Sequence, residues 1–335
     1  MSWQVTYWDV GQGDACDIRT SGGDRILIDV GPHSHLQNPL PAWWMSENQN
    51  ASIRLVLLTH NHSDHFGGLN SLLSNPEQQV SEVILPVDKA YLRAKDTGDL
   101  GRLISLMRER ARQGSLKVRA YPGPGVVYKD EEFQLRIIRP DFINPDDGQT
   151  PNQTSLVIVL ENADAADAQP ILVWCGDVPF PELVDSLRAQ HPVVMDGPHH
   201  GAPQGIKKTV DCHEVLRPIV PRYLYASVGR RNGYDHPSRG YLIDVSRAGA
   251  TVCCSELCEH CGSLCDQHVL KGSGGIGLPQ PEGSVQCRGS MRVVVDKEKG
   301  VIFDGDQELF EKRVRELLPN GYCMVRQASL AELVE

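Results

Sequence analysis

With 335 residues, of which 40% are hydrophobic, the chain is long enough for one large domain with a buried core. Its formal net charge of −10 argues against a protein whose main task is to hold nucleic acid, because such proteins usually carry a basic surface. The sequence has no apolar run of about 18 residues and no leader-like start, so we expect a cytoplasmic protein without a membrane span.

Runs of alternating or continuously apolar residues predict many short strands with helices between them. The first strands cover Gln4–Val10, Ala15–Arg19 and Arg25–Val30, and a hairpin turn at Ser21–Asp24 joins the last two. Further strands are predicted at Ile53–Leu58, Val83–Leu85, Leu116–Tyr121, Phe133–Arg139, Ser155–Leu160, Ile171–Cys175, Pro192–Asp196, Tyr223–Val228, Gly249–Cys253, Met291–Val295 and Val301–Phe303. Helices are predicted at Leu69–Leu73, Lys89–Gln113, Pro181–Gln190, Arg239–Ala248 and Asp306–Leu318. This order favours a layered α/β domain with two sheets.

One short segment, His60-Asn61-His62-Ser63-Asp64-His65, holds three imidazoles and a carboxylate. It follows an apolar run, so we expect it at the carboxyl end of a buried strand. Imidazole nitrogens and carboxylate oxygens are ligands of Zn²⁺, Mn²⁺ and Fe²⁺. We predict that His60 and His62 hold one ion and that Asp64 and His65 turn towards a second. A polar surface turn is the alternative, and the density of ligand groups disfavours it.

Other acidic and imidazole residues also follow predicted strands, namely Asp29, Asp177 and the pair His199-His200. Two ions about 3.5–4 Å apart need a bridging ligand, and we assign that position to Asp177. One histidine of the pair would complete the second site, and we favour His199. Asp9 and Asp14 flank a Gly-Gln-Gly turn, and the sequence leaves open whether this turn approaches the site or is only a turn.

Together these motifs resemble those of the metallo-β-lactamase superfamily, with Asp29 as the first motif, His60–His65 as the second, Asp177 as the fourth and His199-His200 as the fifth. Within it, the chain is most similar to the soluble domain of the DNA-uptake protein ComEC and its stand-alone relatives. That similarity is carried by Trp8–Asp14, Gly176-Asp177, Pro198–Gly201, Ser227–Gly229 and Asn232 through His236-Pro237. It implies a four-layer αββα metallo-β-lactamase sandwich over residues 1–305, with a cysteine-rich insert at about 253–290, and a C-terminal helical tail over residues 306–335.

The chain departs from the superfamily pattern in one place. Many members supply a further metal-binding histidine between the second and fourth motifs, but no histidine occurs here between His65 and His191. The corresponding stretch, Gln149–Ser155, is similar to the Asn-x-x-Ser-Leu pattern of the ComEC-like branch and contains Asn152. The first ion would then have only the two motif histidines and the bridging carboxylate, with water in the remaining positions.

The motifs predict a binuclear hydrolase with two divalent ions, Zn²⁺ or Mn²⁺. Such ions lower the pKa of a bound water from 15.7 towards ~7, so a metal-bound hydroxide attacks while the ions stabilise the developing oxyanion. The resemblance implies a phosphodiester substrate, above all nucleic acid. The alternatives are a small molecule or modified polymer, of phosphorylcholine-ester, lactone or thioester type, and a binding scaffold with a residual metal site. The acidic net charge favours a small substrate, whereas the intact metal motif argues against a scaffold.

Individual residues have expected roles in this chemistry. Asp64 is predicted to be both ligand and proton acceptor, and Asp29 to orient a ligand imidazole from behind. The resemblance adds His236 as a contact to the leaving group or phosphate. It also adds Asn152 and Asn232 as substrate-binding residues.

The segment after residue 252 is rich in cysteine. The spacing Cys254-x3-Cys258-x2-Cys261-x3-Cys265-x2-His268, followed by Cys287, is compatible with a tetrahedral structural zinc, and free buried thiols are the alternative. The resemblance favours Cys254, Cys261 and Cys287, with Cys265 or His268 as the fourth ligand. We expect this segment to support the fold or to form a docking surface. The sequence indicates no particular protein partner or oligomeric state.

Overall fold

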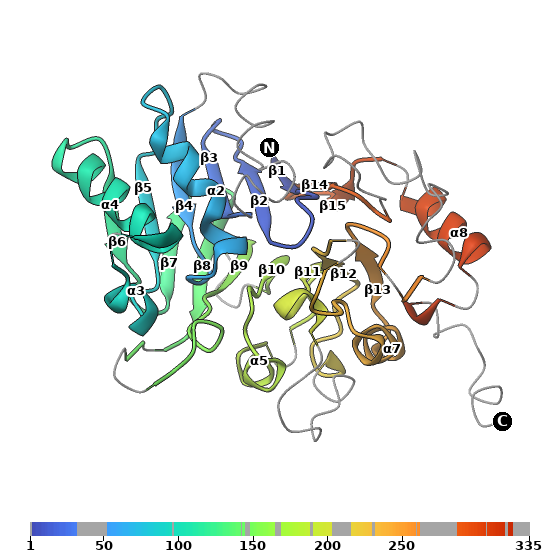
Figure 1. Ribbon diagram of the computed structural model, residues 1–335. Coiled ribbons are helices and arrows are strands. Elements are labelled where there is room, and N and C mark those ends of the chain that lie inside the picture. The colour runs from blue at the N-terminus through green and yellow to red at the C-terminus, as the bar shows by residue number, and fades with distance from the viewer. Residues whose placement is uncertain are drawn as a thin grey trace.

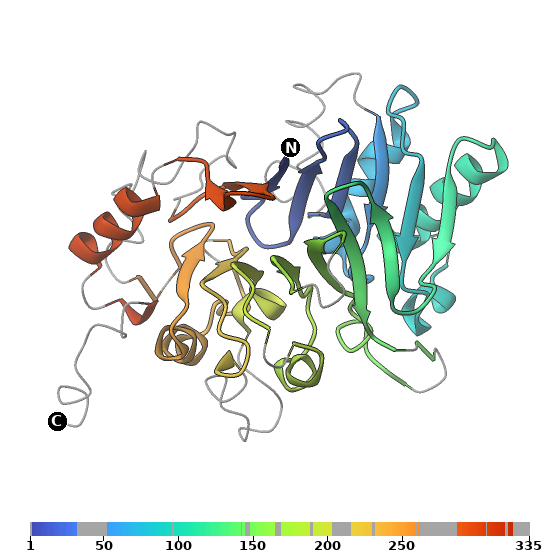
Figure 2. The same ribbon diagram turned by 180° about the vertical axis from the view of Figure 1, so that it is seen from behind.

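The computed structural model describes residues 2–31, 52–95, 97–141, 143–144, 148–164, 169–187, 190–202, 216–229, 232–258, 260–261, 287–305, 307–318 and 321–323. In these residues two β-sheets pack against each other and helices lie on their outer sides (Figure 1). The view from behind shows the second sheet in front of the first (Figure 2). The predicted layered α/β sandwich with two sheets is therefore confirmed.

The first sheet has the strand order β15-β14-β1-β2-β3-β4-β5-β6. Its strands are Ser2–Tyr7 (β1), Ala15–Arg19 (β2), Arg25–Val30 (β3), Ile53–Leu57 (β4), Glu82–Leu85 (β5), Lys117–Ala120 (β6), Met291–Asp296 (β14) and Gly300–Phe303 (β15). Pairing is antiparallel from β15 to β3 and parallel from β3 to β6. The carboxyl ends of β3 and β4 therefore meet at one edge.

The second sheet has the order β13-β12-β11-β10-β9-β8-β7. Its strands are Gly125–Lys129 (β7), Phe133–Arg139 (β8), Val157–Asn162 (β9), Leu172–Trp174 (β10), Val194–Asp196 (β11), Tyr223–Ala226 (β12) and Thr251–Cys254 (β13). Pairing from β10 to β13 is parallel, so the segments that follow β10, β11 and β12 leave the same edge. These segments carry three of the predicted motifs.

Helices cover the outer faces. Figures 1 and 2 show α2 (Ser63–Ser74) and α4 (Gly98–Arg112) on the side of the first sheet that faces away from β7–β9. The remaining helices are α3 (Lys89–Arg93), α5 (Phe180–Leu187), the short 3₁₀ helix η2 (Pro198–Gly201), α7 (Arg239–Ala248) and α8 (Gln307–Leu317). No helix in the described part of the chain combines the length and the apolarity needed to cross a bilayer.

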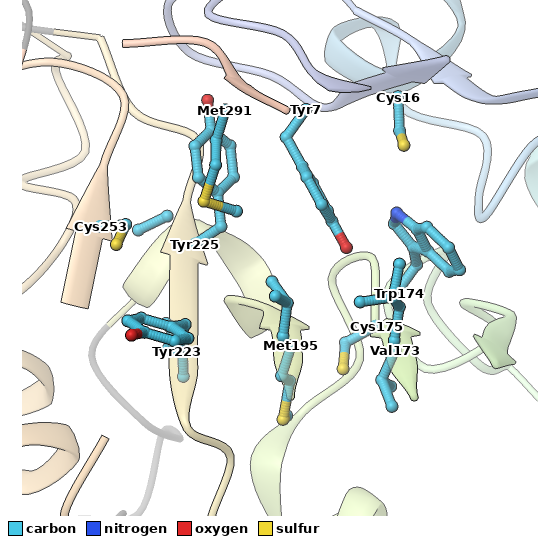
Figure 3. Packing of buried hydrophobic residues seen from close by; sticks show 14 of the residues in the cluster. Tyr7, Cys16, Val173, Trp174, Cys175, Met195, Tyr223, Tyr225, Cys253 and Met291 are labelled. Atoms are coloured by element: carbon cyan, nitrogen blue, oxygen red, sulfur yellow. The ribbon is translucent and has the colours of Figure 1, made fainter. Parts of the chain in front are cut away.

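Two apolar layers hold the sandwich together. Between the sheets, Tyr7 packs between Tyr225 and Trp174, with ring centroids 5.2 and 6.0 Å away (Figure 3). A separate cluster lies between the first sheet and helices α2 and α4 and includes Phe66 and Leu103. Each such buried side chain stabilises the fold by roughly 1.5–3 kcal/mol, and this packing makes the sheet edge a rigid support for a site.

Three sequence-based expectations were wrong in detail. The helix expected at Leu69–Leu73 begins at Ser63, inside the histidine-rich motif. The periodic stretch Lys89–Gln113 forms two helices rather than one, because Gly98 adopts φ +82° and starts a new helix. Strand β7 was missed because its five residues lack the clean alternation of a half-buried strand.

Candidate metal centre

The motif His60–His65 spans the junction between strand β4 and helix α2. Asn61 fixes the turn, because its Nδ2 donates to Asp88 Oδ1 at 3.0 Å and to a neighbouring backbone carbonyl. Helix α2 begins within the motif, so Asp64 and His65 lie in its first turn. The four ligand groups therefore come from a strand end and a helix start, not from a single turn.

Asp177, which follows β10, lies at the centre of the site, and its two oxygens face different histidines. Its Oδ2 is 3.3 Å from His60 Nε2 and 3.9 Å from His62 Nδ1, and these ring nitrogens are 3.0 Å apart. Its Oδ1 is 3.3 Å from His65 Nε2 and 3.5 Å from His200 Nε2, which are 3.3 Å apart. A carboxylate placed in this way can bridge two ions, which is the arrangement predicted for Asp177.

Asp14 joins the second of these groups, and this role was not assigned from the sequence. Its Oδ1 is 3.5 Å from His200 Nδ1, and its Oδ2 is 3.7 Å from His65 Nδ1. The turn that carries it is fixed by two hydrogen bonds. The Asp14 amide donates to the Asp64 carbonyl at 3.2 Å, and the Ser227 hydroxyl donates to the carbonyl of the preceding glycine at 2.5 Å. Of the two alternatives left open above, the turn approaches the site.

The donor set fits divalent cations. With metal–ligand bonds of about 2.1 Å, neighbouring atoms of a tetrahedral site lie roughly 3.4 Å apart, and the N···O distances around Asp177 are 3.3–3.9 Å. Among the described residues, the buried atoms Asp14 Oδ2, Asp177 Oδ1 and His200 Nδ1 have no hydrogen-bond partner. Buried polar atoms without a partner are destabilising, so their presence here indicates a place for an ion.

Asp29 lies behind His65. Its Oδ2 accepts from His65 Nδ1 at 2.8 Å and from the Thr59 hydroxyl at 2.6 Å, and its Oδ1 accepts from the Thr59 amide at 2.8 Å. Because Nδ1 donates to this carboxylate, His65 Nε2 is left to face Asp177. Thr59 Oγ1 also lies 3.2 Å from His60 Nδ1 and orients that ring. The role of Thr59 was missed, and its position directly before the motif was the available signal.

The two histidines after β11 occupy different places. His200 is buried, and its Nε2 lies 3.5 Å from Asp64 Oδ2 as well as from Asp177, so it belongs to the second group. The side chain of His199 is 36% exposed, and its Nε2 lies 3.6 Å from Asp177 Oδ2. Asn152 Nδ2 is 3.4 Å from the same nitrogen. The placement puts His200 in the second group, where the sequence favoured His199, and puts His199 beside Asp177 Oδ2, which faces the first group.

The charges of the site keep its central carboxylates ionised. Burial raises the pKa of Asp177, but His60, His65 and His200 together hold that pKa well below its usual range. Burial also opposes the charge of Asp64, and His65 and His200 again lower its pKa below the usual value. An ionised carboxylate at Asp64 can bind a cation, and its role as a proton acceptor stays a prediction.

The imidazoles of the site divide into two kinds. Burial lowers the pKa of His65 and His200, but facing carboxylates, Asp177 foremost for His65 and Asp14 for His200, raise it well above the usual value. The pKa of His60 is lowered by burial and by the charge of His65. Because an imidazole binds an ion only in its neutral form, ion binding to the second group must release protons.

A surface cavity of about 300 Å³ opens onto these groups. It is lined by Gln12, His62, Ser63, Asp64, Asp177, His199, His200, Tyr234 and His236. Burial, together with the charges of His200 and His199, lowers the pKa of His236 to about 4, so this ring is neutral at neutral pH. His236 therefore lies at the cavity in a form suited to hydrogen bonding, and its contact with a leaving group or phosphate stays a prediction.

Asn232 has a different role from the one expected. Its Nδ2 donates to the carbonyls of Gly229 at 2.9 Å and His236 at 2.6 Å, and its Oδ1 accepts from the amides of Tyr234 at 3.3 Å and His236 at 2.9 Å. These four bonds use the whole hydrogen-bonding capacity of the amide. Asn232 therefore shapes the loop that presents His236 and is not free to bind substrate.

The predicted zinc ligands of the cysteine-rich segment are described only in part. Cys254 is the last residue of β13, and none of Cys254, Cys258, Cys261 and Cys287 forms a disulfide. Cys265 and His268 lie outside the described residues.

Comparison with known proteins finds one family model that matches part of the chain. Residues 8–160 match the family model described as the metallo-beta-lactamase superfamily. No curated protein matches the sequence.

Several solved structures are similar to this chain at low identity. Zinc-bound PqqB from Methylobacterium extorquens is 11% identical, with a TM-score of 0.48 and coverage of 74% of this chain and 97% of that one. The metallo-beta-lactamase fold protein YhfI from Bacillus subtilis is 11% identical, with a TM-score of 0.45 and coverage of 76% and 96%. Unliganded yeast PDE1 is 13% identical, with a TM-score of 0.44 and coverage of 73% and 93%.

Proposed function

We propose that this chain is a binuclear metal-dependent hydrolase of phosphodiesters. The match of residues 8–160 to the metallo-beta-lactamase superfamily model supports this proposal. The observation that carries the proposal is the division of Asp177 between two histidine groups, with Oδ2 towards His60 and His62 and Oδ1 towards His65 and His200. A single ion needs no such division, whereas two neighbouring ions need a bridging ligand.

The residues assigned to the ions follow from these groups. The first ion would take His60 and His62. The second would take His65, His200 and Asp14, with Asp64 beside them, and Asp177 would serve both. Bound Zn²⁺ or Mn²⁺ would supply Lewis acidity and a lowered pKa for coordinated water. Superfamily membership and the donor set do not choose between these two metals.

The protein's own groups around the cavity suit an anionic ester. The neutral imidazoles of His199 and His236 can donate hydrogen bonds to a phosphate, and the low pKa of His236 favours this contact over proton donation to the leaving group. Tyr234 is 69% exposed at the cavity and stacks on His236 with ring centroids 5.7 Å apart. An exposed aromatic ring beside a phosphate site offers a stacking surface for a nucleic-acid base.

We also propose that the chain belongs to the ComEC-like branch. Two of the motifs that carry this resemblance, Trp8–Asp14 and Ser227–Gly229, lie side by side at the site. The Ser227 hydroxyl donates to the Gly13 carbonyl, and the Gly229 amide donates to Gln12 Oε1 at 3.5 Å. Their contact gives a physical reason for both motifs to occur in one protein.

A small phosphodiester or other small ester is the second candidate. The net charge of −10 disfavours long contacts with a polyanion, because unfavourable charge grows with the length bound. The cavity of about 300 Å³ is at the lower end of the range for small-molecule sites.

The test is hydrolysis of single-stranded DNA, duplex DNA, RNA and a generic aryl phosphodiester, each with Mn²⁺, Zn²⁺ and Mg²⁺. We expect cleavage with at least one ion, and loss of cleavage in His62→Ala and Asp177→Ala. Cleavage of the aryl ester without cleavage of any nucleic acid would select the small-substrate candidate. If none of the substrates is cleaved and the purified protein binds no ion at Asp177, the proposal is wrong.

A further inference from the structure

We propose that the protein binds one internal water molecule between its two sheets, and that Asp196 and Tyr7 hold this water against the carboxylate of Asp14. Asp196 and Tyr7 are then positioning residues, because they orient a ligand of the second ion without touching the ion. The water site itself does not depend on the proposed function, whereas its effect on ion binding rests on the proposed second ion.

The water site is a small cavity on the inner side of the metal centre. Its volume is about 10 Å³, and all of its lining residues are buried. Asp14 and Asp29 line it on the side of the first sheet, and Asp196 and Ser227 line it on the side of the second. It shares no lining residue with the surface cavity that opens onto the ion groups. A buried water needs roughly 10–15 Å³, so this cavity has room for one water and for no larger ligand.

Three polar atoms of the lining residues lack a partner. Among the described residues, Tyr7 Oη, Asp196 Oδ1 and Asp14 Oδ2 are buried and form no hydrogen bond. Such atoms are destabilising unless something bonds to them, and a buried water typically makes about three hydrogen bonds to groups of this kind. A single water can donate one hydrogen to each carboxylate and accept the hydrogen of the tyrosine hydroxyl. The donors and acceptors around the cavity therefore match one water.

The tyrosine hydroxyl is held in place as the donor. Burial raises the pKa of Tyr7 well above its usual value, so the hydroxyl keeps its hydrogen at neutral pH. The ring packs between those of Tyr225 and Trp174, which fixes the direction of the hydroxyl. The indole nitrogen of Trp174 points towards the Cys16 thiol instead (Figure 3). We therefore assign the donor role to Tyr7.

Asp196 lines the cavity from the end of β11. It is 4% exposed and pairs in register with Tyr225 of β12, so its backbone is fixed. Burial raises the pKa of its carboxyl well above the usual value, and the charge of Asp14 raises it further, as expected for two carboxyl groups at one small cavity. Asp196 belongs to neither of the two groups of ligand atoms in the described residues that could hold a metal ion. These features favour a water over a cation in this cavity.

Asp14 links the cavity to the second ion. Its main chain is fixed on both sides, because its amide donates to the Asp64 carbonyl and its carbonyl accepts from the Gly31 amide at 2.7 Å. Its carboxylate is less constrained, with Oδ1 3.5 Å from His200 Nδ1 and Oδ2 without a hydrogen-bond partner. A water bonded to Oδ2 would fix the rotation of the carboxylate and leave Oδ1 towards His200. An outer partner of this kind orients a metal ligand and so raises metal affinity.

The first experiment is a high-resolution crystal structure of the full-length protein loaded with Zn²⁺. We expect one peak of density in the cavity, within hydrogen-bond distance of Tyr7 Oη and Asp196 Oδ1, about 2.5–3.0 Å. A wild-type structure without this peak would overturn the water site. A peak with the anomalous signal of zinc would overturn it as well, because the cavity would then hold a metal ion. Both outcomes are independent of what the protein hydrolyses.

Tyr7→Phe tests whether the water orients Asp14. The substitution removes the hydroxyl and keeps the ring, so the packing between the sheets should remain. In competition with a chromophoric chelator for Zn²⁺, we expect the variant to bind the second ion about tenfold more weakly and the first ion as tightly as the wild type. The second ion is identified as the one whose binding His200→Ala weakens. Unchanged affinity for both ions in Tyr7→Phe would refute the positioning role.

Tyr225→Phe is the matched control. Tyr225 lines the same cavity, but its hydroxyl donates to the Gly289 carbonyl at 3.2 Å and points away from the hydroxyl of Tyr7 (Figure 3). This variant should bind both ions as the wild type does. Equal losses in the two tyrosine variants would indicate a general effect on the core and would also refute the positioning role.

Two substitutions of Asp196 separate its hydrogen bonding from its volume. Asp196→Asn keeps a polar group towards the water and should keep most of the affinity for the second ion. Asp196→Leu has a side chain of similar size without polar atoms and should lose about as much as Tyr7→Phe. If Asp196→Leu does not fold, the tyrosine pair decides the positioning role. A loss in Asp196→Asn as large as in Asp196→Leu would show that the carboxyl acts through its charge and would overturn the role of the water.

The water site and the proposed function can fail separately. If the protein binds no ion at Asp177, the proposed function fails, but the density in the cavity still decides whether a water is bound there. If both ions bind and the cavity holds no water, the proposed function stands and the inference drawn from the cavity is wrong.

Discussion

Replacing Asp29 by Asn tests how the protein prepares an imidazole for an ion. The carboxylate is 1% exposed and accepts three hydrogen bonds, two from Thr59 and one from His65 Nδ1. Asp29 has φ +52°, and asparagine tolerates this left-handed conformation well, so the backbone should remain in place. The substitution therefore changes the chemistry of one atom with little change in shape.

The expected loss of metal affinity follows from which atoms carry hydrogen in the contact between residue 29 and His65. Asparagine can still accept from the Thr59 amide through its oxygen, but its NH₂ group then faces His65 Nδ1, where two donors oppose each other. His65 must move its proton to Nε2, the nitrogen that faces Asp177 at 3.3 Å. A protonated Nε2 cannot bind an ion. Loss of such an orienting partner typically lowers metal affinity by about 10–100-fold, or about 1.4–2.8 kcal/mol. The second ion should be affected and the first much less, because His60 is oriented by Thr59.

The assay is competition between the metal-free protein and a chromophoric chelator for Zn²⁺, which resolves the two binding events. Asp17→Asn is the control. Asp17 is a mostly buried carboxylate of the same sheet that pairs with Arg25 at 2.6 Å. Unchanged affinity for both ions in Asp29→Asn would refute the orienting role, and equal losses in both variants would indicate a general effect on folding.

Three further outcomes follow from the same geometry. His200→Ala should remove more of the second ion than His199→Ala does, as measured by metal analysis, and the reverse order would overturn our assignment of the pair. In the metal-free protein, the raised pKa of His65 and His200 adds stability that is fully present below pH ~6.5 and is lost as pH rises through the raised pKa. Zinc binding above pH 7 should therefore release protons, and calorimetry in buffers of different ionisation enthalpy that shows no release would contradict this. Gly176→Ala should destabilise the fold by at least ~1 kcal/mol in urea unfolding, because its added Cβ would lie 2.7 Å from a threonine hydroxyl at φ +50°. Gly22→Ala, with nothing nearer than 3.9 Å, should not.

Much of the fold is predictable because the local signals agree. The strands Ala15–Arg19, Arg25–Val30 and Phe133–Arg139 and the helix Arg239–Ala248 have the predicted bounds. Each of these strands is apolar or alternating and is followed by a polar or proline-containing turn, and the helix has a serine cap and a terminal glycine at φ +104°. Where local signals conflict, as in the long periodic stretch interrupted at Gly98, the bounds are wrong.

The candidate site is predictable only as a set of strand ends. The positions of Asp29 and Asp177 after apolar runs are sequence features, and each aspartate lies near the carboxyl end of a strand in its own sheet. The inclusion of Asp14 is not local, because its turn is held over the site by Ser227, which lies more than 200 positions away. The choice between the paired histidines also escapes the sequence. Both have φ near +50°, and only the packing of their turn decides which ring is buried.

The buried charges of the site weigh against a protein that uses this fold only for binding. Asp14, Asp29 and Asp177 are each at most 6% exposed, and burying a carboxylate is costly unless it is paired. In the metal-free form the pairing comes from His65 and His200, which are held protonated. Bound ions would displace these protons and take over the pairing, so the same carboxylates would serve both states. A scaffold without ions would be more stable with apolar residues at these positions. Carboxylates that can pair either with protonated histidines or with metal ions are what a reversible metal site requires.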